Sequence, residues 1–351
     1  MSKYDIGVYY FPNFHTGDAR NNKWHGEGWS EREVLRNARP RFEGHYIPKP
    51  AWGYEDEKDP KVMEKKIKAA SEAGITNFIF DWYYYDDGPF LNRCLEEGFL
   101  KAKNTNDLKF SLMWANHDWK HIHPVSLAGL DEPLIQAPGK VTPETFDRIM
   151  DYVIEHYFVQ ENYYRLEGGL YFSIYELFGF IDSMGGVEGA KKAIVKFREK
   201  VAAKGLGKLH MNAVTWGCKI LDGESTKPVT AELLKEIGFD STTSYVWIHE
   251  HPTRNFPKHE YSEYIEECAG DFDRLTKKYE GVPYYPNVTV GWDSSPRTLQ
   301  SDMFVEKWYP FMSALVNNTP ELFEKALRTA KAQLDGSPLT TKMLTINAWN
   351  E

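Results

Sequence analysis

The sequence predicts a single α/β domain folded as a (β/α)8 TIM barrel, and three observations support this prediction. Eight short and nearly continuous apolar runs are spread over 351 residues, as expected for parallel strands that are covered on both faces. Segments with helical periodicity lie between these runs. The first run leads into FPNFH rather than a glycine-rich phosphate loop, and no Walker A motif occurs, so a doubly wound nucleotide-binding sheet is disfavoured.

The predicted strands are runs of Ile, Val, Leu, Phe, Tyr and Met that end in polar and aromatic residues. They cover residues 6–10, 77–82, 109–114, 170–175, 209–215, 241–245, 284–290 and 343–348.

Helix signals fill the intervals between the strands. Asp59 followed by Pro60 is a typical N-cap and first helical residue, and Gly74 provides the stop. Thr142 and Pro143 repeat the same start signal. Further helices are expected near residues 90–103, 187–204, 229–237, 260–280 and 319–335.

No repeat, low-complexity tract or linker divides the chain, so residues 1–351 are expected to form one catalytic domain. Residues at about 11–58 form a long aromatic and charged insertion after the first strand, which suggests a lid or a wall. The sequence ends at Glu351, directly after the eighth strand, so the last helix of the barrel is expected to be absent from this chain.

Composition excludes several classes of function. A net charge of −9 argues against a nucleic-acid surface, and no apolar run approaches the ~18–20 residues of a membrane span. Three widely spaced cysteines give neither a disulfide framework nor a zinc motif. Without a visible signal peptide the protein is expected in the cytoplasm, or in the periplasm or outside the cell if a signal has been removed. The oligomeric state stays open.

Residues just beyond the strands of a TIM barrel converge on one pocket. Here almost every strand ends in an aromatic residue beside a carboxylate, an amide or an imidazole. Many of these aromatic residues could simply be core, but sugars need this mixture, because their CH faces stack on rings while their hydroxyls bind polar groups. The predicted substrate-binding residues are Tyr10, Asp81, Trp82, Asn116, His117, Asp118, Tyr175, Glu176, Trp216, Tyr245, Trp292, Asp293 and Asn350.

Glycoside cleavage usually needs a pair of carboxyl groups. The candidates are Glu351, Glu176, Asp81, Asp118 and Asp293, and each could instead form a salt bridge or bind a hydroxyl.

Two segments contain residue types that could hold a metal. The segment HDWKHIH (residues 117–123) contains imidazole and carboxylate ligands, but a sugar-binding loop uses the same residue types. Asp271 and Asp273 match the DxD pattern of sugar-nucleotide transferases, although a helix start also favours aspartate there. We expect no metal and no cofactor.

Five motifs resemble the WbsX-type family. They are YDIGVYYFPNFH (4–15), PRFEGH (40–45), FDWYYY (80–85), MWANHDW (113–119) and INAWNE (346–351), and the resemblance covers essentially the whole chain. That family is named for glycosyl transfer in surface-polysaccharide biosynthesis, such as O-antigen or capsule assembly. Its fold is similar to glycoside hydrolase family 99, which contains endo-α-mannosidases and endo-α-mannanases.

The resemblance implies a retaining, metal-independent mechanism with two glutamates in an Asn-Glu-Trp-x-Glu motif after the last strand. In that mechanism the first glutamate deprotonates the sugar 2-hydroxyl, which gives a 1,2-anhydro sugar, and the second is the general acid/base. Asn350 and Glu351 match the start of the motif, so Glu351 is the predicted catalytic residue. The acid/base position lies three residues beyond it.

The favoured interpretation is therefore a retaining glycoside hydrolase, similar to an endo-α-mannosidase, that acts on an oligosaccharide or polysaccharide. The alternatives are a glycosyltransferase of polysaccharide assembly and a non-catalytic carbohydrate-binding barrel. Sugar identity, linkage and endo or exo action stay open.

Overall fold

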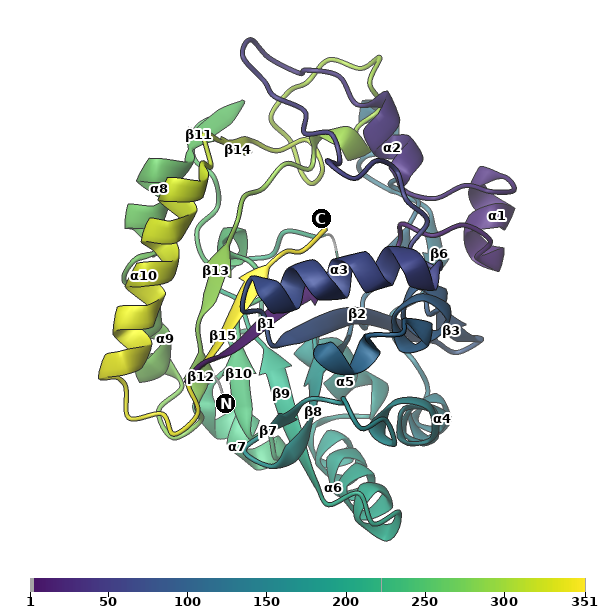
Figure 1. The fold of residues 1–351 in the computed structure, drawn as a ribbon, viewed down its shortest axis with the longest axis vertical. Coiled ribbons are helices and arrows are strands. Elements are labelled where there is room, and N and C mark those ends of the chain that lie inside the picture. Colours follow the sequence, from purple (N-terminus) through teal and green to yellow (C-terminus); the bar gives the residue numbers. More distant parts are fainter. Residues whose placement is uncertain (1–2, 222, 351) are drawn as a thin grey trace.

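The computed structural model describes residues 3–221 and 223–350 and confirms the predicted barrel, with parallel strands inside a ring of helices (Figure 1). The sheet path runs β12-β10-β9-β8-β4-β2-β1-β15-β13, and every pairing along it is parallel. The barrel strands are β1 (Asp5–Tyr10), β2 (Asn77–Tyr85), β4 (Lys109–Trp114), β8 (Gly169–Ile174), β9 (Lys208–Val214), β10 (Ser241–Thr243), β12 (Tyr284–Tyr285), β13 (Asn287–Thr289) and β15 (Met343–Asn347).

The seventh predicted strand, residues 284–290, is divided at Pro286 into β12 and β13. β12 pairs with β10 while β13 pairs with β15, so the two halves join opposite ends of the sheet path and nearly close the ring. Pro286 has no N–H to donate, but its carbonyl accepts a hydrogen bond of 2.9 Å from the N–H of Thr345. The eight predicted strands therefore occupy the eight positions of the barrel.

The helices begin where the capping signals predict. Asp59 accepts a hydrogen bond from the N–H of Lys61, and Thr142 accepts one from the N–H of Thr145. Nowhere in the described chain is a helix both long and apolar enough to cross a bilayer. The helices around the barrel are α3 (Pro60–Glu72), α4 (Pro143–Val153), α5 (Leu177–Ser183), α6 (Val187–Ala203), α7 (Ala231–Ile237), α8 (Tyr261–Cys268), α9 (Asp271–Lys278) and α10 (Pro320–Gly336).

Two helical segments differ from the prediction. The segment near 90–103 contains a π-helical turn (Cys94–Gly98) and a 3₁₀ turn (Phe99–Lys101) instead of an α-helix. Gly98 packs so closely on the insertion that a Cβ there would lie 2.2 Å from the carbonyl oxygen of Glu57. The segment 260–280 is divided into α8 and α9 at Ala269 and Gly270.

Side-chain alternation along the strands separates two cores. Tyr9, Ile79 and Met113 pack inside the barrel, whereas Tyr10 and Phe80 belong to the core between the barrel and its helices. Asn77 occupies an inner position two residues before Ile79 and donates a hydrogen bond of 2.9 Å to the Ser111 hydroxyl. On β2 the next inner position toward the carboxyl end is residue 81.

The insertion after β1 carries α1 (Ala19–His25) and α2 (Arg32–Asn37) and forms one wall above the barrel (Figure 1). It is bonded to the segment that follows β13. Arg297 donates to Glu31 at 2.6 Å, and Arg41 donates to the backbone carbonyls of Gln300 and Asp302. The insertion after β1 and the segment after β13 are therefore connected to each other at the carboxyl end of the barrel.

Short strands complete the fold and stabilise the loops. They are β3 (Gly88–Phe90) beside β2, β5 (Trp119–Lys120) beside β6 (Ile135–Ala137), β7 (Arg165–Leu166) beside β8, and β11 (Lys258–Glu260) beside β14 (Ala314–Val316).

Candidate active site

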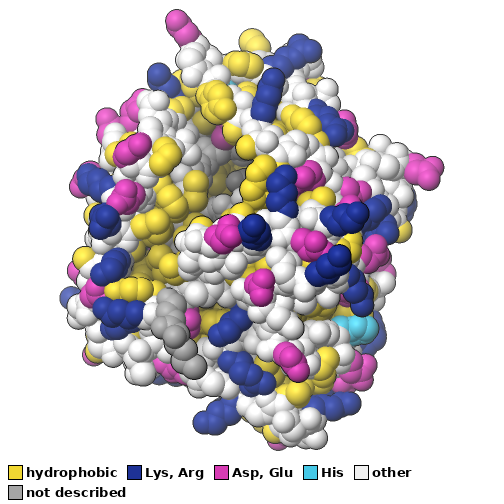
Figure 2. Space-filling model, in the orientation of Figure 1, with side chains coloured by type: hydrophobic (Ala, Val, Ile, Leu, Met, Phe, Trp, Pro, Cys, Tyr) yellow, Lys and Arg dark blue, Asp and Glu magenta, His cyan; other side chains and the backbone are white. Residues whose placement is uncertain are grey.

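A cavity of roughly 390 Å³ lies at the carboxyl ends of the barrel strands. Figure 2 shows a hollow in the upper part of the molecule, between the regions labelled α2 and β14 in Figure 1. Six predicted site residues line the cavity: Asp81, His117, Asp118, Tyr175, Tyr245 and Trp292. Further lining residues include Phe11, Tyr83, Trp119, Lys219, Ile220, Leu221, His249, Arg297, Trp308 and Tyr309.

Asp81 occupies the inward position near the end of β2 and is 2% exposed. Its Oδ2 accepts a hydrogen bond of 2.9 Å from the Tyr245 hydroxyl, which comes from the segment after β10. The Tyr245 ring lies 4.7 Å from the ring of Tyr9 and 5.5 Å from that of Tyr175. A carboxylate therefore sits among three phenol rings, an arrangement that suits a sugar with one polar edge and one apolar face.

The loop after β4, the strand that pairs with β2, supplies a further part of the cavity lining. Asp118 Oδ1 accepts a hydrogen bond of 2.8 Å from the N–H of Gly139, where an added Cβ would lie 2.3 Å from the backbone of His117. The His117 ring lies 5.5 Å from Tyr175, and the Trp119 ring packs 6.4 Å from Phe11. This loop therefore presents an imidazole and a carboxylate beside aromatic faces.

The histidines of segment 117–123 have different neighbours. His117 is beside Tyr175, His121 interacts with the Gln136 amide at 2.8 Å, and His123 stacks on Trp119 at 5.2 Å. Each of the three histidines therefore packs against or bonds to a different neighbour, and His117 and His123 belong to the cavity lining.

Tyr10 and Trp82 were predicted to bind substrate, but the structure places both outside the cavity lining. Both point outward from the barrel, because each follows an inward residue, Tyr9 or Asp81, on the same strand. The Trp82 indole donates a hydrogen bond of 3.1 Å to the Tyr157 hydroxyl in the outer core. These two residues stabilise the fold and do not line the cavity.

Asn116 and Glu176 also do not line the cavity. The Asn116 side chain is bonded to the backbone N–H and C=O of Glu176, each at 2.7 Å. Glu176 caps α5 by accepting from the N–H of Gly179. Burial raises the pKa of Glu176, against the lowering effect of the backbone N–H groups that it accepts from. The Asn116 side chain therefore connects the loop after β4 to the loop after β8.

Asp293 and Trp216 lie near the cavity but outside its lining. Asp293 accepts from the N–H of Ser295 and contacts Nε2 of His45 at 3.0 Å. Trp216 donates from its indole to the carbonyl of Ser225 at 2.9 Å, and its ring packs against Tyr175 at 5.1 Å. Trp216 therefore supports a residue of the cavity from behind.

Asn350 anchors the chain after β15. Its side chain exchanges two hydrogen bonds with the backbone of Phe11, at 2.9 and 2.7 Å, and also contacts the carboxylate of Glu57. Glu57 is fully buried and contacts Arg32 and Lys66. Glu351, the predicted catalytic residue, lies outside the described residues.

Sequence reasoning missed a buried carboxylate, Glu224, in the loop after β9. It accepts from the Tyr175 hydroxyl and contacts Nε2 of His249 at 3.2 Å, and both partners line the cavity. Burial by itself would raise the Glu224 pKa, but His249, Tyr175 and the N–H of Ile220 bring it below its ordinary value. The only signal in the sequence was the length of the loop between the strand at 209–215 and the helix near 229–237.

Trp308 and Tyr309 were also missed. Trp308 is 69% exposed although it lines the cavity, which places its ring at the mouth. It comes from the long segment between β13 and β14, in which no periodic pattern marks a site.

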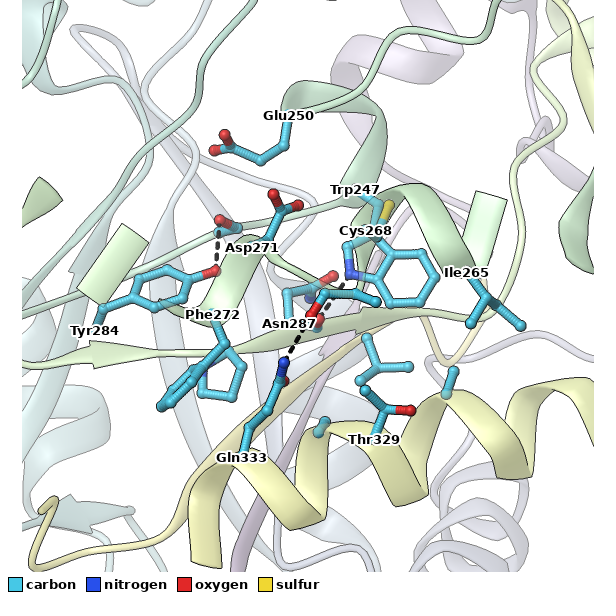
Figure 3. A pocket seen from close by; sticks show the side chains of 16 residues that line it. Trp247, Glu250, Ile265, Cys268, Asp271, Phe272, Tyr284, Asn287, Thr329 and Gln333 are labelled. Atoms are coloured by element: carbon cyan, nitrogen blue, oxygen red, sulfur yellow. Dashed lines mark hydrogen bonds between the residues drawn. The ribbon is translucent and has the colours of Figure 1, made fainter. Parts of the chain in front are cut away.

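Asp271 lies in a separate pocket on the flank of the barrel, bounded by α8, α9, α10 and β13 (Figure 3). This pocket holds roughly 30 Å³ and is much smaller than the main cavity. Asp271 is bonded to Arg274 at 2.8 Å and to His251 at 2.9 Å. The DxD pattern therefore corresponds to a helix start with an ion pair.

Two solved structures share the fold over nearly the whole chain. The GH99 endo-alpha-mannosidase from Bacteroides thetaiotaomicron is 12% identical, with a TM-score of 0.56, covering 100% of this chain and 86% of that one. A glycoside hydrolase-like protein is 13% identical, with a TM-score of 0.58, covering 99% and 84%. At such identities the likeness concerns the fold.

The class of fold is a TIM barrel, and the family whose profile matches the chain is described as a glycosyltransferase family. The chain belongs to the WbsX glycosyltransferase family, whose sequence profile matches residues 6–351. The WxcX proteins of Xanthomonas campestris pv. campestris strains B100 and ATCC 33913 are each 24% identical to it over 360 residues. The match covers 98% of this chain and 45% of each relative, so the chain spans less than half the length of these relatives.

Proposed function

We propose that residues 1–351 form the catalytic domain of a retaining glycoside hydrolase that acts on an oligosaccharide or polysaccharide, as an endo-α-mannosidase does. The observation that carries this proposal is the Asp81 carboxylate, held by Tyr245 among phenol rings inside a cavity at the carboxyl ends of the strands. The cavity of roughly 390 Å³ falls in the usual size range of small-molecule sites. Asp81 and Asp118 would bind sugar hydroxyls while Tyr175, Tyr245 and Trp292 cover the apolar face of the ring.

Glu351 would deprotonate the sugar 2-hydroxyl, as the resemblance to family 99 implies. It directly follows Asn350, whose side chain is bonded to the backbone of Phe11 and to Glu57. Phe11 itself lines the cavity. The oxygen of the 2-hydroxyl would then displace the leaving group, which the second glutamate of the motif protonates, and form a 1,2-anhydro sugar. Water, deprotonated by the same glutamate, would open that ring at the anomeric carbon with net retention of configuration.

A glycosyltransferase is the second candidate, favoured by the description of the family. Such an enzyme needs a nucleotide-sugar or lipid-linked donor. The DxD aspartate, which often serves such donors through a divalent ion, is paired with Arg274 here, away from the main cavity. The hydrolase proposal therefore accounts better for the cavity.

The test is a product analysis with the full-length protein. It would be incubated with α-mannan fragments and other bacterial oligosaccharides, with and without a mixture of nucleotide-sugars and Mg²⁺, and the products separated by anion-exchange chromatography. A hydrolase shortens the oligosaccharide without a donor, and NMR of the fresh product shows the anomeric configuration of the substrate. Products that appear only with a donor would establish the transferase, and binding without any product would establish a non-catalytic barrel.

A further inference from the structure

The Glu224 carboxylate connects the backbone of residues 220–221 to the side chains of Tyr175 and His249, and all of these partner residues line the cavity. Its Oε2 accepts from the backbone N–H groups of Ile220 and Leu221, at 2.7 and 2.9 Å, and both residues line the cavity. Its Oε1 accepts from the Tyr175 hydroxyl and faces Nε2 of His249 at 3.2 Å. The side chain is completely buried, so four protein groups surround it in place of water.

The protons in this cluster have defined positions. An ionised carboxylate can only accept hydrogen bonds, and the electrostatic effect of His249, together with the hydrogen bonds from His249, Tyr175 and Ile220, keeps the Glu224 pKa below its ordinary value despite burial. Burial and the adjacent Glu224 charge hold the Tyr175 pKa well above its ordinary value, so Tyr175 keeps its proton and donates it to Glu224. His249 must then carry a proton on Nε2 in order to bond to the same oxygen.

Two hydrogen-bond acceptors are left for a ligand. The Tyr175 oxygen retains its lone pairs once its proton is directed at Glu224. The second ring nitrogen of His249, Nδ1, is buried without a hydrogen-bond partner in the structure, and it is an acceptor in the tautomer that carries its one proton on Nε2. The ring centroids of Tyr175 and His249 lie 6.2 Å apart, so the two side chains are neighbours in the lining of the cavity.

We propose that Glu224 is a positioning residue that presents Tyr175 and His249 to the cavity as a pair of acceptors, and that this pair selects a sugar with two adjacent free hydroxyls. The inference rests on the proposed carbohydrate function and adds a specificity to it. A ligand that lacks one of the two hydroxyls leaves a buried acceptor unpaired, which is strongly unfavourable.

The decisive variant is Glu224→Gln. Its amide oxygen can still accept from Ile220 and Leu221, but its amide nitrogen then faces Tyr175 and His249 as a donor. His249 should therefore move its proton from Nε2 to Nδ1, and the cavity should present donors in place of acceptors. Nitrogen-15 NMR of labelled histidine reports this tautomer directly and needs no ligand.

The matched control is Glu96→Gln. Glu96 also accepts from two tyrosine hydroxyls, those of Tyr152 and Tyr157, at 2.7 and 2.6 Å, but it is outside the cavity lining. This variant should leave the His249 tautomer and ligand selectivity unchanged. Tyr175→Phe provides a second test, because it removes one acceptor and keeps the Glu224 carboxylate.

Affinities for a bound oligosaccharide and its monodeoxy analogues would be measured by calorimetry. We expect the wild type to discriminate by about 10- to 100-fold against removal of either of two adjacent hydroxyls. Glu224→Gln should lose this discrimination at both positions, and Tyr175→Phe at one of them. An unchanged His249 tautomer in Glu224→Gln, or equal weakening toward every analogue, would overturn the inference while the carbohydrate function stands. A protein that shows the tautomer change but binds no carbohydrate would instead overturn the proposed function and the diol preference with it.

Discussion

The Tyr245 hydroxyl donates a 2.9 Å hydrogen bond to Oδ2 of Asp81, joining residues 164 positions apart in the chain. Asp81 belongs to β2, and Tyr245 follows β10, so the barrel must close before the two groups meet. The contact holds a buried carboxylate in one orientation inside the cavity.

Tyr245→Phe should weaken oligosaccharide binding by roughly 10- to 100-fold, the usual range for loss of a hydrogen bond to a charged group. Phe keeps the packing against Tyr9 but removes one donor from the buried Asp81 carboxylate, so the free energy of unfolding should also fall, by about 1–3 kcal/mol. Titration calorimetry and urea denaturation would measure the two effects. Tyr164→Phe is the control, because the Tyr164 hydroxyl makes an equivalent 2.9 Å hydrogen bond to Asp5 at the amino-terminal end of the barrel. Equal affinities for Tyr245→Phe and the wild type would remove this contact from the site.

Trp82→Phe should lower the free energy of unfolding by about 1–3 kcal/mol, through loss of core volume and of the bond to Tyr157. Sugar affinity should stay within twofold of wild type, because the side chain faces the helices. Trp292→Ala should show the reverse, with weaker binding and a smaller effect on unfolding, since Trp292 is half-buried at the cavity. A binding defect in Trp82→Phe at normal stability would contradict the outward placement.

Glu351→Gln should abolish turnover in the full-length protein while oligosaccharide binding remains. Gln matches Glu in size but cannot remove a proton, so only the chemical step should fail. A 2-deoxy substrate should resist the wild type, since the internal nucleophile is missing. Steady-state rates and calorimetry would test both expectations. Normal turnover by the variant would exclude Glu351, whereas an inactive variant together with cleavage of the 2-deoxy substrate would reject the anhydro-sugar route.

The His251–Asp271 pair should make stability depend on pH. The hydrogen bond to Asp271 raises the His251 pKa above its ordinary value of 6.5, so the folded state binds the proton more tightly than the unfolded state does. This stabilisation is complete below pH 6.5 and is lost as the pH rises through the higher folded-state pKa. The difference in Tm between wild type and His251→Gln should therefore be largest near pH 6 and shrink toward pH 9.

His210 provides a control of opposite sign. Burial lowers its pKa to about 4, so the unfolded state takes up the proton first as the pH falls. Its contribution is present above pH 6.5 and is lost as the pH falls toward 4. The Tm advantage of wild type over His210→Gln should consequently decline in acid, and a His251 difference that also declined in acid would reject the assigned sign.

The strands could be predicted because each is a local apolar run that has to be buried on both faces. The prediction for residues 109–114 agrees with β4 (Lys109–Trp114) at both ends, and the caps at Asp59 and Thr142 begin helices as expected. The π-helical turn at Cys94–Gly98 was not predictable, because it depends on how closely Gly98 approaches Glu57.

The site could be predicted only in part. Asp81 and Tyr175 line the cavity as expected. The Asn116 side chain instead forms hydrogen bonds with the backbone of Glu176. A polar residue after a strand can face the cavity or satisfy backbone groups of a neighbouring loop. Which of the two occurs depends on whether a neighbouring loop places a backbone N–H or C=O within hydrogen-bond distance. The residue pattern along one strand carries no information about that loop.

The sequence by itself determined the class of fold, the order of the strands and the end of the barrel at which polar residues gather, because burial and capping act over a few neighbouring residues. Only the tertiary structure decided that Tyr9 and Asp81 face inward while Tyr10 and Trp82 face outward. On a strand covered on both faces the apolar pattern is the same for either orientation, so closure of the barrel has to select one. The same closure brings Glu224 from a distant loop onto Tyr175 and His249, since contacts between loops form only when their strands are paired.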